Sequence, residues 1–146
     1  MKHREDKVKA SHKFAVIFLT LSFVLSFAVA AFAAHDEIPR ITIEETKKMM
    51  DSKVPIVILD TQLKSVYEKG HIKGAINFPW KQEITPEDTN NLPKDKLIIT
   101  YCDCGPGETD SSDIAAQLTG LGFSDVEVLA DPAIRGWIKA GYPTEK

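Results

Sequence analysis

The stretch that decides the fold is "KLIITYCDCGPGETDSSDIAAQLTGLGF", residues 96–123. It begins with a run of apolar and β-branched residues, 96–102, which is typical of a parallel strand buried on both faces. In the part after the cysteines, 110–123, apolar residues recur at helical spacing, which predicts an amphipathic helix that Asp110 caps. The stretch therefore predicts a strand, a loop and a helix, with Cys102 and Cys104 where the strand ends.

Segments on both sides of this unit repeat the alternation of strands and helices. Further strands are predicted at 41–43, 54–60, 75–78 and 125–130, and further helices after residue 43 and within 131–143. Thr42 and Glu45 form a predicted capping box at the start of the first helix. This order predicts an α/β fold in which helices cover both faces of a parallel sheet. Ligands of such sheets bind at the carboxyl ends of the strands.

The first 33 residues differ from the remainder of the sequence. A basic stretch precedes the apolar run "FAVIFLTLSFVLSFAVAAFAA", which ends with Ala31 and Ala33 in the pattern of a signal peptidase site. This predicts a secretory signal peptide cleaved after Ala33, and an uncleaved membrane anchor is the alternative. Residues 34–146 then form a single domain, which we expect in the periplasm or another extracytoplasmic space.

The exported part is acidic. From His35 onward it has 13 Lys and Arg residues against 19 Asp and Glu residues, a formal net charge of −6. Such a surface repels nucleic acid and anionic lipid at long range. Nucleic acid is therefore not an expected partner, and a membrane is one only if the first segment stays uncleaved.

The sequence has two cysteines, separated by one residue. A disulfide across one residue closes almost no loop and would stabilise the fold little, so the pair indicates a chemical role. Gly105 and Gly107 allow the loop to curl with its amides inward, and the following helix adds partial positive charge. Such a loop favours a thiolate or a persulfide at Cys102. The alternative is a small apolar residue that only ends a strand.

Four ordered segments resemble the rhodanese-like family. They are "VILDTQLKSVYEKGHIKGAINFPW" (57–80), "LIITYCDCG" (97–105), "AAQLTGLGF" (115–123) and "VLADPAIRGWIKAGYP" (128–143). The resemblance implies a rhodanese fold, which is a five-stranded, mainly parallel sheet flanked by helices. It also implies that Cys102 opens the active-site loop and that sulfane sulfur transfer is the activity, with no cofactor. The implied anion-binding loop comprises Asp103, Gly105, Pro106, Gly107, Glu108 and Thr109.

The sequence departs from the family pattern near the expected pocket. Glu108 stands in a loop that usually ends in an arginine, and Gln62 replaces a second arginine after Asp60. Three acids stand in or next to the loop, Asp103, Glu108 and Asp110. We expect their Coulomb repulsion to disfavour thiosulfate binding, a thiolate at Cys102 and hence thiosulfate-to-cyanide transfer. Arg135 either replaces the missing loop arginine or is a solvated charge on the last helix. Asp60 either faces the pocket or caps a helix.

The second cysteine suggests a reaction sequence. Cys104 could resolve a persulfide or a mixed disulfide at Cys102, which would release reduced sulfur and leave an internal disulfide. The sequence therefore predicts an exported sulfurtransferase or thiol-redox protein that uses a small sulfur-containing anion and a thiol acceptor, a protein thiol included. The alternative is a catalytically inactive module that binds a protein or a metal.

No metal site is expected. A structural zinc site needs about four ligands, and the exported part offers the two cysteines, His35, His71 and acids such as Glu108. His71 is predicted to make a structural hydrogen bond instead. Capture of copper(I) by the two thiolates is the chemical alternative.

Overall fold

The computed structural model describes residues 37–146, so the predicted signal peptide, 1–33, lies outside the described residues. Within them, Ile38–Lys146 form one compact unit. Over the same described part, no helix has the length and apolar character needed to cross a membrane. Cleavage of the first segment stays a prediction.

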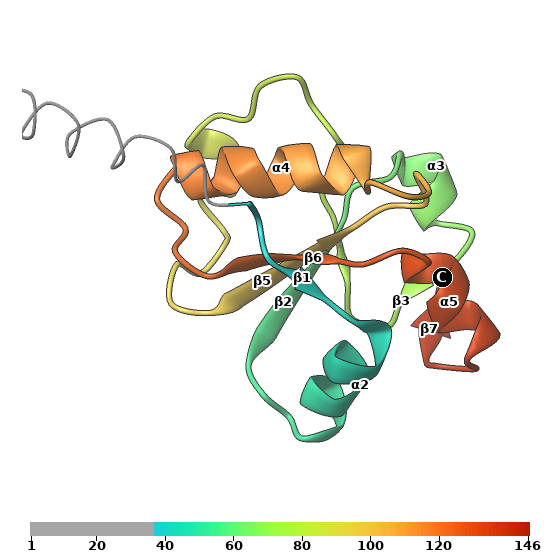
Figure 1. The fold of residues 1–146 in the computed structure, drawn as a ribbon. Coiled ribbons are helices and arrows are strands. Elements are labelled where there is room, and N and C mark those ends of the chain that lie inside the picture. Colours follow the sequence, from blue (N-terminus) through green and yellow to red (C-terminus); the bar gives the residue numbers. More distant parts are fainter. Residues whose placement is uncertain (1–36) are drawn as a thin grey trace, which may run out of the picture. The chain divides into compact units, whose positions relative to one another are not determined.

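The main sheet has five strands, all parallel (Figure 1). In spatial order they are β1 (Arg40–Ile41), β6 (Val126–Leu129), β5 (Leu97–Tyr101), β2 (Ile56–Asp60) and β4 (Ile76–Asn77). The central strand, β5, pairs with both β2 and β6. The predicted α/β class and the five-stranded parallel sheet are confirmed.

Helices cover both faces of this sheet (Figure 1). α2 (Ile43–Asp51) and α5 (Ala133–Lys139) lie on one face and α4 (Thr109–Gly120) on the other. Neighbouring side chains of β5 point to opposite faces of the sheet. Ile99 packs in the core on the side of α2 and α5, and Ile98 packs in the core on the side of α4. Successive side chains of a strand alternate between faces, which explains why a strand covered on both sides has no polar alternation.

The helix starts are partly as predicted. At α2 the capping box is present, because Thr42 Oγ1 accepts a hydrogen bond from the Glu45 amide at 3.2 Å and Glu45 Oε2 accepts one from the Thr42 amide at 3.1 Å. The predicted cap of α4 by Asp110 is wrong. α4 begins one residue earlier, at Thr109, and its N-cap residue is Glu108, whose side chain makes no capping hydrogen bond.

Smaller elements complete the fold. A single turn, α3 (Lys64–Tyr67), and a 3₁₀ turn, η1 (Glu87–Thr89), lie in the connections, whereas β3 (His71–Ile72) and β7 (Thr144–Glu145) pair antiparallel. The sequence did not predict this second sheet. His71 lies in it with its ring stacked on that of Tyr67, and its Nδ1 is 2.9 Å from the carbonyl oxygen of Tyr67. The predicted structural hydrogen bond of His71 is thereby confirmed.

The two tryptophans differ in depth. Trp137, on α5, is fully buried and its indole N–H donates to the carbonyl oxygen of Pro143 at 2.8 Å. Trp80 is 44% exposed, and its indole N–H donates to Asp113 Oδ2 at 2.6 Å. One ring therefore belongs to the core and the other to the surface.

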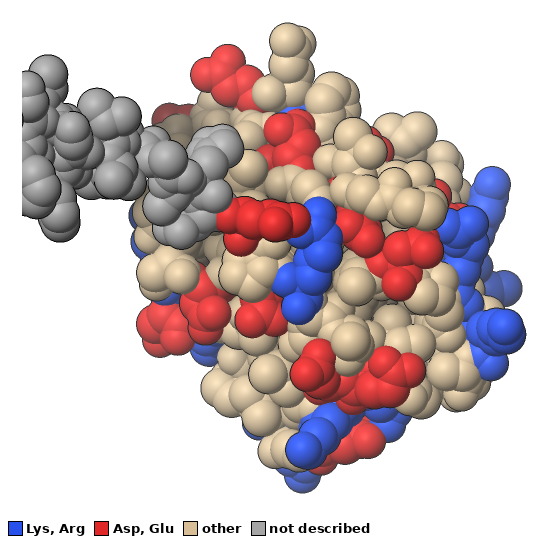
Figure 2. Space-filling model, in the orientation of Figure 1, with Lys and Arg blue, Asp and Glu red and all other residues tan. Residues whose placement is uncertain are grey.

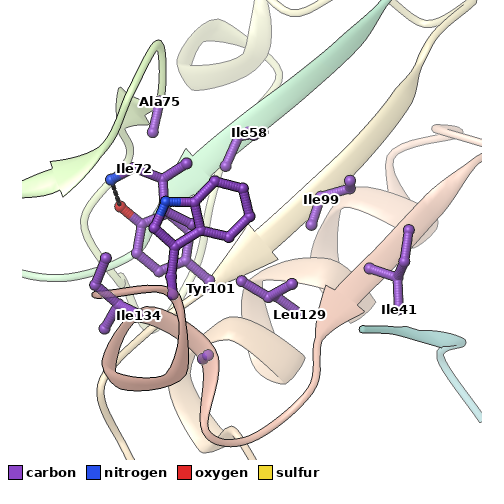
Figure 3. Packing of buried hydrophobic residues seen from close by; sticks show 10 residues of the cluster. Ile41, Ile58, Ile72, Ala75, Ile99, Tyr101, Leu129 and Ile134 are labelled. Atoms are coloured by element: carbon purple, nitrogen blue, oxygen red, sulfur yellow. Dashed lines mark hydrogen bonds between the residues drawn. The ribbon is translucent and has the colours of Figure 1, made fainter. Parts of the chain in front are cut away.

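Tyr101 connects three elements at the end of β5. Its buried hydroxyl donates to Asp60 Oδ2 at 2.6 Å. It also accepts from the amide of Ile72 at 3.1 Å, as Figure 3 shows. Burial, and then the negative charge of Asp60, raise the pKa of Tyr101, so the hydroxyl remains a donor. The carboxyl ends of β5 and β2 are thus held to β3.

We expect Tyr101→Phe to lower the free energy of unfolding by about 2 kcal/mol, because the buried carboxylate of Asp60 loses a donor and the Ile72 amide loses its acceptor. Urea unfolding measures the change. Tyr142→Phe is the matched control, since that ring packs edge-on against Trp137 and its hydroxyl makes no hydrogen bond to the described residues. Equal stability of the two variants would contradict the role assigned to Tyr101.

Candidate active site

The loop with the two cysteines leaves the carboxyl end of β5 and leads into α4. The strand end is fixed from the neighbouring strand, because the amide and hydroxyl of Thr61 both donate to the carbonyl oxygen of Tyr101, at 2.9 and 3.0 Å. Cys102 follows directly. The predicted position of the cysteine, at the carboxyl edge of a parallel sheet, is found in the structure.

Cys102 and Cys104 are joined by a disulfide, with their Cα atoms 5.5 Å apart. The two sulfurs have different surroundings, since Cys102 is only 3% exposed whereas Cys104 lies on the surface. Cys102 Sγ is 3.5 Å from the hydroxyl oxygen of Ser111, a fully buried residue in the first turn of α4. The sequence predicted a helix over this stretch but did not identify Ser111 as the neighbour of the thiol.

The loop backbone curls as its glycines allow. Gly105 and Gly107 have φ angles of 79° and 94°, in the left-handed region that glycine adopts most readily. The amide of Glu108 donates to the carbonyl oxygen of Gly105 at 3.1 Å and closes a turn around Pro106. Within the described residues, the amides of Asp103 and Cys104 donate to no backbone oxygen.

A pocket of about 220 Å³ lies beside the disulfide. Its lining consists of Gln62, Leu63, Val66, Cys102, Asp103, Cys104 and Asp110. Of the six predicted anion-binding residues, Asp103 contributes to this lining. The other five, Gly105 to Thr109, do not line the pocket and form the turn after the cysteines and the start of α4.

Glu108 does not line this pocket and is 6% exposed. One carboxylate oxygen accepts from Arg40 Nε at 3.0 Å, and the other accepts from the amide of Asp131 at 2.8 Å. Its backbone is left-handed, with φ of 43°. Glu108 therefore fastens the end of the loop to β1 and to the segment after β6, and Arg40 compensates its charge.

Arg135 reaches the loop from α5. Its Nε lies 2.7 Å from Asp103 Oδ1 and its Nη2 lies 3.3 Å from Asp131 Oδ1. The side chain is about half exposed and does not line the pocket. Arg135 thus brings a positive charge to the cysteine loop, and this charge offsets the negative charge of Asp103.

Asp60 is fully buried and neither lines the pocket nor caps α3, whose N-cap residue is Leu63. Besides Tyr101 it binds Gln62, whose amide N–H and side-chain Nε2 donate to Oδ1 at 2.9 and 3.2 Å. Gln62, two residues after the end of β2, therefore supplies hydrogen-bond donors to this buried carboxylate. Neither role predicted for Asp60 is found.

The charges around the site are mixed. Two of the three loop acids are paired with arginines, Glu108 with Arg40 and Asp103 with Arg135. Figure 2 shows acidic side chains spread over the face that it displays, with basic side chains between them and along its right edge. Because of these ion pairs, repulsion of an anion is weaker than the number of acids suggests.

Within residues 37–146, no group of three or more His, Cys, Asp and Glu side chains is arranged to hold a metal ion.

Comparison with known proteins gives a consistent result. A family model described as "Rhodanese-like domain" matches residues 42–140. The putative sulfur carrier protein YrkF of Bacillus subtilis is 31% identical over 101 residues, which are 68% of this chain and 51% of that protein. The chain thus spans about half the length of this relative.

Solved structures with the same fold include the BH2092 protein from Bacillus halodurans, with a TM-score of 0.65 and 26% identity over 82% of this chain and 85% of that one. The rhodanese-like domain of the Alr3790 protein from Anabaena has a TM-score of 0.62 and 29% identity, covering 73% of this chain and 78% of that one. A thiosulfate sulfurtransferase from Pseudomonas aeruginosa, at 23% identity, has a TM-score of 0.58 over 77% of this chain and 21% of that one. This last similarity concerns the fold alone.

Proposed function

The chain belongs to the rhodanese-like domain family, and from this premise we propose that it carries sulfane sulfur as a persulfide on Cys102, with Cys104 as the resolving thiol. One observation carries the proposal. The bond between the two sulfurs shows that the loop brings Cys104 Sγ within bonding reach of Cys102 Sγ while the strand end stays fixed. The similarity to a putative sulfur carrier supports a sulfurtransferase-like role.

Loading begins with the reduced protein. The Cys102 thiolate attacks the outer sulfur of a donor such as thiosulfate or a persulfide, the S–S bond of the donor breaks, and sulfite or a thiolate leaves with the electron pair. Amides of the curled loop and the positive end of α4 stabilise negative charge at this place. The hydroxyl of Ser111, 3.5 Å from Cys102 Sγ, is a further donor for a thiolate.

Unloading can take two routes from the same persulfide. A thiol acceptor can attack the outer sulfur and leave with it, which returns the Cys102 thiolate. Alternatively the Cys104 thiolate attacks Cys102 Sγ, hydrosulfide leaves, and the disulfide forms. The second route ends in the bond that the structure contains. It would make the protein a thiol-redox enzyme that releases sulfide.

We place this activity in an extracytoplasmic compartment. The support is the basic and apolar segment at residues 1–33 with its Ala-x-Ala ending. Disulfides persist in oxidising compartments, which agrees with the oxidised pair. The partners are then a small sulfur-containing anion as donor and a small or protein thiol as acceptor.

The test is intact-mass spectrometry of reduced protein after separate incubation with thiosulfate, inorganic polysulfide and glutathione persulfide. We expect a mass gain of one sulfur atom, located on Cys102 by peptide fragmentation. The adduct should last at least about ten times longer in Cys104→Ser, because the resolving thiol is absent. Failure of all three donors to label protein with both thiols free would overturn the proposal and favour a catalytically inactive module.

A further inference from the structure

The disulfide must be reduced before Cys102 can accept sulfur again, and its two sulfurs are not equally accessible. Cys102 is 3% exposed and lies against the first turn of α4, whereas Cys104 lies on the surface. A thiolate attacks a disulfide at one sulfur, and access decides which one. An incoming thiolate therefore reaches Cys104 Sγ.

The leaving group favours the same direction. Attack on Cys104 expels Cys102 as a thiolate, which Ser111 and the start of α4 can stabilise. Attack on Cys102 would expel the surface thiolate of Cys104 instead. A stabilised thiolate is the better leaving group, so the accessibility of Cys104 and the stabilisation of the Cys102 thiolate favour the same direction of attack.

The surface beside Cys104 has an apolar and an acidic part. Leu63, which is 69% exposed, and Val66, which is 38% exposed, line the pocket on the side of α3. Asp103 and Asp110 line it from the loop and from α4. A partner with apolar groups around its reactive thiol and no negative charge would complement this surface. Arg135 offsets the charge of Asp103, so the acidic character comes mainly from Asp110 and disfavours anionic thiols only mildly.

We propose that a dithiol protein docks on Leu63 and Val66 and reduces the bond by attacking Cys104. Its first thiolate bonds to Cys104 Sγ, the Cys102–Cys104 bond breaks, and Cys102 receives the electron pair. The partner's second thiolate then attacks its own first sulfur, and Cys104 leaves as a thiolate. The partner is oxidised to its disulfide by two electrons, which this domain gains. The inference rests on the proposed function only for the need to regenerate Cys102.

The direction of attack is tested with three small thiols on the oxidised protein: cysteamine, 2-mercaptoethanol and glutathione. After a brief reaction, free thiols are blocked with N-ethylmaleimide and the peptide that contains both cysteines is fragmented. We expect the mixed disulfide on Cys104 and the blocking group on Cys102, with a preference of about tenfold or more. At equal thiolate concentration, glutathione should be slowest because of its negative charge. An equal distribution, or a preference for Cys102, would overturn the direction.

The docking surface is tested with thioredoxin as the probe dithiol protein. We expect Leu63→Ser and Val66→Ser each to slow reduction by thioredoxin roughly fivefold, through lost apolar contact, while reduction by 2-mercaptoethanol is unchanged. Ile138→Ser is the matched control, because Ile138 is 57% exposed and does not line the pocket. A rate with thioredoxin that no variant changes, or that all three change equally, would overturn the surface.

The two proposals fail separately. The exchange experiments use no sulfane sulfur, so their outcome does not depend on whether Cys102 forms a persulfide. Selective attack on Cys104 combined with no mass gain from any donor would leave a thiol-redox domain without sulfur-carrier activity. A persulfide on Cys102 combined with unselective exchange would leave the sulfur carrier and remove the assigned direction of reduction.

Discussion

Cys102→Ser is expected to abolish sulfur transfer, with turnover reduced by roughly three orders of magnitude or more. A serine hydroxyl at this position can neither attack the outer sulfur of the donor nor hold it as a persulfide, and the remaining thiol, Cys104, lies on the surface. The measurement is the rate of sulfide release from glutathione persulfide in the presence of excess dithiothreitol, corrected for the reaction without protein.

Cys104→Ser separates the two thiols in the same assay. It should load with sulfur as the wild type does but release sulfide only through the external thiol. Both variants should unfold within about 1 kcal/mol of the oxidised wild type, since a bond across one residue constrains the unfolded chain little. Wild-type turnover in Cys102→Ser would show that the reactive sulfur is elsewhere.

Glu108→Ala is expected to lower the free energy of unfolding by about 2 kcal/mol. The substitution removes the acceptor of the Asp131 amide and the partner of Arg40 at a position that is 6% exposed. The Arg40 side chain is 36% exposed, so solvent screens part of the ion pair and the amide hydrogen bond carries much of the effect. Urea unfolding of the reduced protein measures the loss.

The same variant should slow sulfur loading of Cys102, because the loop loses its attachment to β1 and to the segment after β6. Glu108→Gln keeps an acceptor for the Asp131 amide and should lose only about half as much stability. Glu83→Ala is the control for removing an acid, since Glu83 is an exposed residue of the connection before η1. Wild-type stability and loading in Glu108→Ala would contradict a positioning role for Glu108.

The sequence predicted the parts of the fold that are encoded locally. β2, β5 and β6 are short apolar runs because helices cover both faces of the sheet, and that pattern is visible without a partner strand. β3 and β7 were missed because each has two residues and their pairing joins His71 to Glu145, far apart in the sequence. A ladder of that length has no periodicity of its own.

The site was predictable to the same extent. The position of Cys102 followed from the strand before it, and the curl of the loop followed from Gly105 and Gly107. The partners of the charged residues could not be predicted from the sequence. Glu108 binds Arg40, which is 68 positions away, and Asp103 of the loop binds Arg135 of α5. A count of acids in the loop therefore overstated the negative charge that a ligand would meet.

Because Trp137 is buried and Trp80 is exposed, the domain has two intrinsic fluorophores that differ in their accessibility to solvent. Emission from the buried indole reports loss of the core, whereas an aqueous quencher contacts only the surface indole. The amide of Trp80 donates to the carbonyl oxygen of Thr61, next to Gln62 in the pocket wall. We therefore expect the fluorescence of the unlabelled protein to give separate signals for unfolding and for changes near the pocket.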